Sequence, residues 1–144
     1  MKTFECGANT ENLNKITSIV EAELEELGCG MKQTMQLMIA LEEIFVNIAH
    51  YAYSKAGDDG KLIPDTGTGP MRLIVDSKDG AVTLTFEDEG MPYNPLEKPD
   101  PDITLTAEER QIGGLGIYMV KKSMDNVIYE HRDGKNILTL MKNL

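Results

Sequence analysis

The sequence predicts an α/β two-layer sandwich, in which one mixed or antiparallel sheet is covered on one face by about three helices. Three observations predict this class. Segments with a helical period are separated by segments with a strand period, and the strand segments come in neighbouring pairs joined by short turns. The composition, 41% hydrophobic and 26% charged, is that of a globular chain. Since 144 residues is the length of one ordinary domain, we expect residues 1–144 to form a single domain ordered β-α-α-β-β-loop-α-β-β.

Three segments have the spacing of amphipathic helices. The first begins at a cap provided by Asn9 or Thr10 and ends at Gly28, a residue suited to the left-handed end of a helix. The second runs from about residue 32 to residue 53, and the third opens at the glycines of residues 113–116. The residues expected to face the sheet are Leu13, Ile16, Val20, Leu24 and Leu27, then Leu37, Leu41, Ile44 and Ile48, then Ile117, Val120 and Met124.

The remaining segments are expected to be strands and loops. The predicted strands are residues 2–6, 71–76, 81–87, 126–131 and 137–142. Lys78-Asp79-Gly80 and Asp133-Gly134 are typical hairpin turns between them. Residues 55–70 are rich in Gly, Asp and Pro, and we expect them to be too polar to pack. Residues 91–112 are rich in proline and poor in apolar residues, and a loop of that length is usually functional or mobile.

Charge and rare residue types exclude several classes of function. A formal net charge of −10 repels phosphate backbones and anionic lipids, so we expect no direct binding to nucleic acid or to membranes. No apolar run approaches the roughly 20 residues that a membrane-spanning helix needs. The N-terminus lacks the apolar region of a signal peptide, which predicts a cytoplasmic protein. Two cysteines and two histidines, each pair far apart in sequence, argue against a disulfide framework or a structural zinc site.

The second predicted helix carries the first candidate site. Glu43 and Asn47 lie one turn apart on a narrow polar stripe that also includes Gln36, His50 and Ser54. Asparagine is unfavourable inside a helix, because its amide competes for backbone hydrogen bonds. An asparagine beside a glutamate can supply oxygen ligands to a hard cation such as Mg²⁺. Taken alone, the two residues also fit a solvated helix face.

The second candidate site follows the strand that ends near residue 88. Asp88 opens the segment Asp88–Pro95, and a carboxylate in that place can accept a hydrogen bond from an exocyclic amine. Gly90 lets a flat ligand approach the backbone, since it has no side chain. The alternative is an ordinary turn that ends a strand.

The third candidate site is the sequence Gly113-Gly114-Leu115-Gly116 at the start of the third helix. Unpaired backbone N–H groups and the positive end of the helix dipole can face an anion there. The glycines match neither a Walker A loop, since no Lys-Ser/Thr follows, nor the full Rossmann fingerprint. A flexible hinge before a helix is the alternative.

In chain order the three clusters read E-x-x-x-N, D-x-G-x-P-[aromatic]-N-P and G-G-L-G-I. Together they resemble the motifs of the Bergerat-fold (GHKL) ATPases and, within these, of the anti-sigma-factor serine/threonine kinases. The matching stretches are residues 41–47, 88–95 and 113–118, and the resemblance extends from about residue 10 to residue 142. The second motif is more typical of the anti-sigma group than of two-component histidine kinases.

The resemblance implies that the chain binds ATP with Mg²⁺. It implies that Asn47 is a Mg²⁺ ligand and that Glu43 activates the attacking hydroxyl. Asp88 would accept a hydrogen bond from the adenine amino group, and Gly90 would lie in the wall of that pocket. The phosphates would bind the backbone of Gly113, Gly114, Leu115 and Gly116.

Other positions match the family less closely. Relatives often place a threonine in the adenine pocket where this chain has Asn136, and Thr139 is a nearby alternative. A basic residue before the glycines corresponds to Arg110, whose role on the γ-phosphate stays open. The second helix closes with Tyr51-Ala52-Tyr53, and His50 is displaced by one position from the histidine of relatives.

The function implied by the resemblance is that of an ATP-dependent protein-serine/threonine kinase and anti-sigma regulatory factor. Its partners would be a sigma factor, which it sequesters, and a small anti-sigma-factor antagonist, which it phosphorylates. Residues 91–112 would form a lid over the nucleotide. The alternative is a nucleotide-gated protein-binding module with little or no phosphotransfer, and the presence of Glu43 favours the kinase. A protein-binding domain without nucleotide would require all three clusters to be coincidental. The sequence leaves a homodimer open.

Overall fold

The computed structural model describes residues 1–97 and 115–144, with only the backbone of Leu115 included. The helices of this part are α1 (Leu13–Glu26), α2 (Met31–Asn47) and α3 (Leu115–Ser123). The strands are β1 (Lys2–Gly7), β2 (Lys55–Ala56), β3 (Leu62–Ile63), β4 (Pro70–Lys78), β5 (Ala81–Asp88), β6 (Asn126–Arg132) and β7 (Lys135–Asn143). Short 3-10 turns lie at Thr10–Asn12 and Pro95–Glu97, and a π-helical turn lies at Ile48–Ala52.

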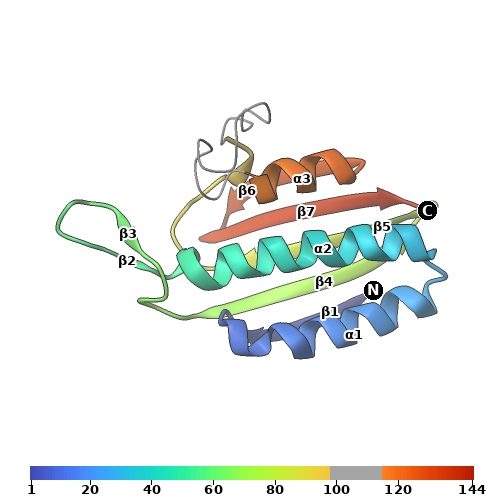
Figure 1. Ribbon diagram of the computed structural model, residues 1–144, viewed down its shortest axis with the longest axis horizontal. Coiled ribbons are helices and arrows are strands. Elements are labelled where there is room, and N and C mark those ends of the chain that lie inside the picture. The colour runs from blue at the N-terminus through green and yellow to red at the C-terminus, as the bar shows by residue number, and fades with distance from the viewer. Residues whose placement is uncertain (98–114) are drawn as a thin grey trace.

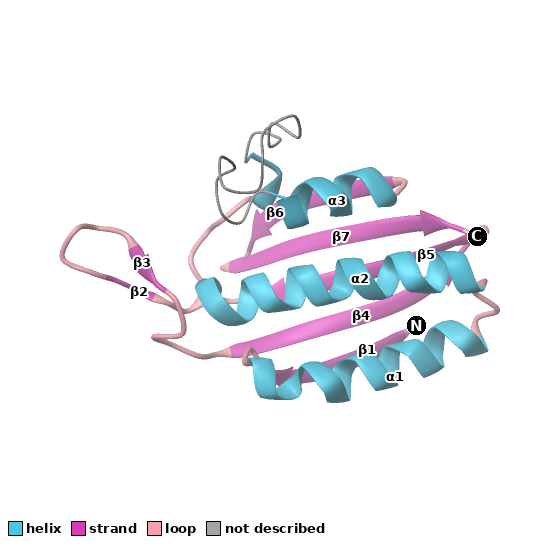
Figure 2. Cartoon of the chain, in the orientation of Figure 1, coloured by secondary structure: helices cyan, strands magenta, loops and turns pink. Residues whose placement is uncertain are grey.

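The main sheet of the structure has five strands. Its strand order is β1-β4-β5-β7-β6, and each neighbouring pair is antiparallel. The three helices lie on one face of this sheet, with α2 between α1 and α3, and no helix of the described residues covers the other face (Figures 1 and 2). The predicted two-layer class is therefore confirmed, and so is the order of the three helices and of the five strands of this sheet; the sheet is antiparallel, one of the two arrangements predicted.

The hairpin turns form where the sequence predicts them. Asp79 and Gly80, between β4 and β5, have φ values of 54° and 78°. Asp133 and Gly134, between β6 and β7, have φ values of 55° and 76°. Two successive residues with positive φ match the twist of a tight antiparallel hairpin, and Asp-Gly tolerates that conformation. Gly28 also has a positive φ, 77°, two residues after the end of α1.

The core lies between the helices and the sheet. Nine of the twelve residues predicted to face the sheet are buried, and Leu13, Leu27 and Ile48 are half-buried against the same core. The largest fully buried side chains come from both layers: Leu24, Leu37, Leu41 and Phe45 from the helices, and Leu73, Leu84, Phe86 and Leu140 from the sheet. This packing holds the carboxyl-terminal end of α2 against the ends of β5 and β7.

The predicted second helix differs from the structure beyond Asn47. The α-helix ends there and continues as a π-helical turn through Ala52, instead of running as an α-helix to residue 53. A π turn contains more residues than an α turn, so side chains after it leave the predicted polar stripe. Ser54 is buried and donates a hydrogen bond to the carbonyl of His50. The side chain of His50 contacts Asp65, with Nδ1 and Oδ1 2.7 Å apart.

Residues 55–70 were predicted to be too polar to pack, and none of them is buried, but the prediction missed a short pair of strands within them. Strands β2 and β3 form a small hairpin that projects at the end of α2 (Figure 1). The side chain of Asp65, after β3, contacts that of His50. The backbone N–H of Asp65 also donates to the carbonyl of His50, at 3.0 Å. The connection folds because these polar groups satisfy one another, which an apolar-periodicity argument does not detect.

The described part of the chain contains no helix with both the length and the apolar character needed to cross a membrane. The predicted lid at residues 91–112 lies mostly outside the described residues, which on that segment end at Glu97.

Candidate functional site

A cavity of about 350 Å³ lies on the helix side of the sheet, where β5, β6 and β7 meet the end of α2. Its walls are mostly apolar and include Ile44, Ile48, Phe86, Ile117 and Leu138. Three polar side chains that the sequence predicts as site residues also line the cavity: Asn47, Asp88 and Asn136. Apolar walls with a few placed polar groups are the usual composition of a small-molecule site.

Asp88 is the buried acceptor of this cavity. It is the last residue of β5 and its side chain is 6% exposed. Both of its hydrogen bonds within the described chain reach Oδ1, from Asn136 Nδ2 and from the backbone N–H of Gly90, each at 2.9 Å. Oδ2 accepts none there, so one oxygen remains for a ligand. Burial raises the pKa of Asp88, while the hydrogen bonds from Asn136 and Gly90 and the nearby His131 counteract part of that rise.

The segment after Asp88 packs against the π-helical turn and is hydrogen-bonded to it. A Cβ on Gly90 would lie 2.1 Å from the carbonyl oxygen of Ala52, so only glycine permits this approach. The N–H of Met91 donates to the same carbonyl at 3.1 Å. The hydroxyl of Tyr53 accepts from the N–H of Glu89 at 2.7 Å and donates to the carbonyl of Pro70. Gly90 is therefore in the wall of the site through its backbone.

Glu43 and Asn47 lie together, as their spacing predicts. Asn47 Nδ2 donates to Glu43 Oε1 at 3.3 Å, which leaves the amide oxygen of Asn47 available at the cavity. Glu43 lies against the first turn of α3, since a Cβ on Gly116 would be 1.9 Å from its Oε1. A side chain at position 116 would displace the Glu43 carboxylate. The structure thus brings together α2 and the start of α3.

Asn136 and Thr139 lie on opposite faces of β7. Asn136 is directly opposite Asp88 in the strand register and its side chain points into the cavity. Thr139 pairs with Thr85 on the face of the sheet away from the helices, with 3.4 Å between their hydroxyl oxygens. The structure therefore brings Asn136, and not Thr139, to the site. Arg110, Gly113, Gly114 and the side chain of Leu115 lie outside the described residues.

Several residues at the cavity were not predicted from the sequence. Tyr53 and Tyr129 bond to groups around Asp88, and Lys61 and Leu62 reach the cavity from the β2–β3 hairpin. The aromatic residues of the segment Tyr51-Ala52-Tyr53 were the one available signal, because polar-tipped aromatic residues near an apolar site usually find a buried partner.

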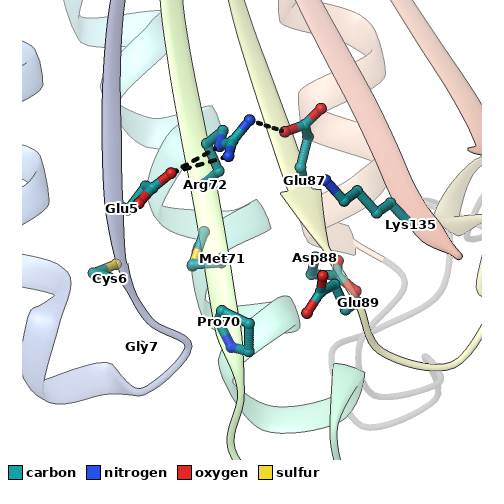
Figure 3. Close-up of a pocket in the computed structure, with 10 residues that line it drawn as sticks. All are labelled: Glu5, Cys6, Gly7, Pro70, Met71, Arg72, Glu87, Asp88, Glu89 and Lys135. Atoms are coloured by element: carbon teal, nitrogen blue, oxygen red, sulfur yellow. Dashed lines mark hydrogen bonds and ion pairs between the residues drawn. The ribbon is translucent and has the colours of Figure 1, made fainter. Parts of the chain in front are cut away.

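A second cavity, of about 450 Å³, lies near the same end of the sheet on the side away from the helices. Figure 3 shows Glu5, Arg72 and Glu87 in a row across β1, β4 and β5. Arg72 forms ion pairs with Glu5 at 3.0 Å and with Glu87 at 3.5 Å. The guanidinium at the centre of this larger cavity is thus paired on both sides.

The helix-side cavity fits an adenine nucleotide by the chemistry of its residues. Asp88 presents an open carboxylate oxygen, the backbone at Gly90 permits close approach, and the walls are apolar. For Mg²⁺, the donor available is the amide oxygen of Asn47. The described residues contain no group of three or more His, Cys, Asp or Glu side chains that could hold a metal. Mg²⁺ commonly keeps several waters and takes few protein ligands, so one amide oxygen is compatible with it.

Comparison with known proteins shows the family of the chain. A family model described as "Histidine kinase-like ATPase domain" matches residues 6–142. The anti-sigma F factor of Geobacillus kaustophilus is 23% identical over 139 residues, which cover 96% of this chain and 87% of the relative. The serine-protein kinase RsbW of Bacillus thuringiensis is 26% identical over 112 residues, or 78% of this chain and 66% of the relative. The serine/threonine-protein kinase BtrW of Bordetella bronchiseptica is 34% identical over 59 residues, which span 41% of this chain and 42% of the relative.

Proposed function

The chain belongs to the histidine kinase-like ATPase domain family, and on that premise we propose that it is an ATP-dependent protein-serine/threonine kinase and anti-sigma factor. Membership implies ATP binding, and the relatives named as anti-sigma factor and serine-protein kinase support the wider role. Its protein partners are then a sigma factor, which it sequesters, and a small anti-sigma-factor antagonist, which it phosphorylates. Residues 91–112 as a lid and assembly as a homodimer remain predictions.

One observation carries the kinase proposal beyond ATP binding. Asn47 lines the nucleotide cavity and is hydrogen-bonded to Glu43, so the proposed metal ligand touches the proposed base. A module that only binds nucleotide does not require a carboxylate such as Glu43 beside the metal ligand, whereas transfer to a hydroxyl requires a base there. Glu43 also lies against Gly116, in the first turn of the helix that follows the glycine motif.

The residues of the site have separate roles in this proposal. Asp88 accepts a hydrogen bond from the adenine amino group through Oδ2, and the apolar walls exclude water from the base. Asn47 holds Mg²⁺ through its amide oxygen. Glu43 would orient the serine hydroxyl of the partner and accept its proton as the hydroxyl oxygen bonds to the γ-phosphorus. The bond from that phosphorus to the β–γ bridging oxygen breaks, and ADP leaves. Bound Mg-ATP supplies the phosphoryl group and the neutralisation of its charge, so positioning is the main task of the protein.

The substitution Glu43→Gln tests the proposal. It keeps the size of the side chain but removes the base, so transfer to a serine-bearing partner should fall about 10²–10⁴-fold while ATP affinity stays within about twofold. Partners are captured from extract of the source organism with and without ATP, and phosphosites are mapped by mass spectrometry. Glu42→Gln, at the exposed neighbouring position, is the matched control and should transfer at the wild-type rate. ATP and partner binding without any transfer would favour the nucleotide-gated binding module instead.

A further inference from the structure

Asn136 is the most highly bonded buried side chain at the nucleotide cavity. It lies on β7 and is 6% exposed. Its Nδ2 donates to Asp88 Oδ1 at 2.9 Å and to the carbonyl of Met91 at 2.8 Å, with the carbonyl of Gly90 at 3.4 Å. Its Oδ1 accepts from the N–H of Tyr93 at 3.2 Å and from the hydroxyl of Tyr129.

These contacts use the full hydrogen-bonding capacity of the amide. A primary amide has two N–H donors and one oxygen that accepts two hydrogen bonds. The two short bonds from Nδ2 take both donors, and Tyr93 and Tyr129 take both acceptor positions. The reverse orientation of the amide is excluded, because the groups around Nδ2 are carbonyls and a carboxylate and cannot donate. A nucleotide therefore finds no free donor or acceptor on Asn136.

The partners of Asn136 show what the amide does instead. Its bond to Asp88 occupies Oδ1, which leaves Oδ2 without a hydrogen bond from the described chain. Its bonds to Met91 and Tyr93 hold the chain directly after β5, at the beginning of the segment predicted to be the lid. Tyr129 on β6 holds the amide from the opposite side. One side chain thus links the base-reading carboxylate to the segment that follows it.

We propose that Asn136 is a positioning residue, which makes no bond to the nucleotide but sets the specificity of the pocket for adenine by presenting Asp88 Oδ2 alone. This inference rests on the proposed function for the identity of the ligand. With both amide donors occupied, the only polar group that Asp88 and Asn136 offer to the base is an acceptor. An exocyclic amine, as in adenine, satisfies it, whereas the O6 carbonyl of guanine or hypoxanthine faces it with a second acceptor.

The proposal predicts a change in the titration of Asp88. The Asn136 amide favours the ionised carboxylate, so Asn136→Ala should raise the pKa of Asp88 further. The groups around Asp88 that could also contribute are His131 and Tyr129 on β6, Tyr53 after the π turn and the adjacent Glu89. They are unchanged in the variant. Carboxyl-carbon NMR of the nucleotide-free protein measures the titration midpoint directly, beside the unaltered protein.

The second readout is the discrimination between bases. Binding of ADP and of inosine diphosphate is measured by calorimetry for the unaltered protein, Asn136→Ala and Tyr129→Phe. The preference for ADP should fall about tenfold in Asn136→Ala and about two- to fivefold in Tyr129→Phe, because Asp88 is then free to rotate. Affinity for inosine diphosphate should change less than affinity for ADP. Asn126→Ala, at an exposed position of β6, is the matched control and should keep the full preference.

Two outcomes would overturn the role of Asn136. One is an equal loss of ADP and inosine diphosphate affinity in both variants, which would indicate general damage to the pocket. The other is an unchanged midpoint of Asp88 in Asn136→Ala. Circular dichroism checks that each variant folds, and Tyr129→Phe, which keeps the aromatic ring, covers the case in which Asn136→Ala does not. If the unaltered protein bound no adenine nucleotide, the proposed function would fail, while the Asp88 titration would still test the positioning of the carboxylate.

Discussion

The two cavities at the end of the sheet share Asp88 but differ in what their polar groups contact. On the open side, Arg72 is paired with both Glu5 and Glu87, and the cavity has a volume of about 450 Å³. On the helix side, about 350 Å³ is enclosed by apolar walls, and one oxygen of Asp88 has no partner within the described chain. The cation at the centre of the larger cavity is thus paired on both sides, whereas the smaller cavity offers a carboxylate oxygen among apolar groups.

This difference shows that volume alone does not identify a ligand site. A carboxylate oxygen among apolar groups can gain a hydrogen bond when a ligand binds, and a hydrogen bond to a charged group is worth about 1.5–3 kcal/mol. Ion pairs at an exposed face are each worth at most about 1 kcal/mol and are weakened by salt. We therefore expect the helix-side carboxylate, rather than the open-side ion pairs, to bind a ligand.

The strongest test of this comparison exchanges one carboxylate for an amide in each cavity. Asp88→Asn removes the charged acceptor and should lower ADP affinity about 10- to 100-fold, the value of a buried hydrogen bond to a charged group. Glu87→Gln, at the preceding residue but facing the open side, should change ADP affinity less than twofold. Isothermal titration calorimetry measures both. Equal losses in the two variants would contradict the assignment of the site to the helix side.

A second test concerns the backbone at the wall of the helix-side cavity. Gly90→Ala places a methyl group 2.1 Å from the carbonyl of Ala52, and the backbone must move to admit it. The free energy of unfolding should fall by about 1–3 kcal/mol, as for other overpacked sites. At Gly57 a Cβ would meet the flexible end of Ile63 at 3.2 Å, so Gly57→Ala should cost less. Urea denaturation compares the two, and an equal cost would show that the approach of residue 90 to Ala52 is not constrained.

The third and smallest expected effect is the response to mild acid. Because burial raises the pKa of Asp88, the folded protein takes up this proton at a higher pH than the unfolded chain does. As pH falls through that raised pKa, the contribution of Asp88 to stability should rise, while ADP affinity should fall because the acceptor is lost. Denaturation and calorimetry at successive pH values check the opposite signs. In Asp88→Asn both trends should weaken, and parallel trends in the unaltered protein would contradict the role of Asp88.

The sequence predicted those parts of the fold that depend on neighbours along the chain. Apolar residues at helical spacing, such as Val20 and Leu24, are buried, and Asp79-Gly80 and Asp133-Gly134 form their turns. Glu43 and Asn47 touch because one helical turn separates them. The spacing of apolar residues did not predict two features, the π turn after Asn47 and the β2–β3 hairpin. Neither feature has an apolar pattern to reveal it.

The sequence by itself therefore determined the order of elements, the buried faces and the motif residues. Tertiary structure decided which of those residues meet. Asn136 and Asp88 are 48 positions apart and become partners because β7 pairs with β5, while the alternation of that same strand directs Thr139 to the opposite face. The physical reason is that spacing in a sequence sets local conformation, whereas the bonding of a buried amide depends on groups supplied by several strands at once.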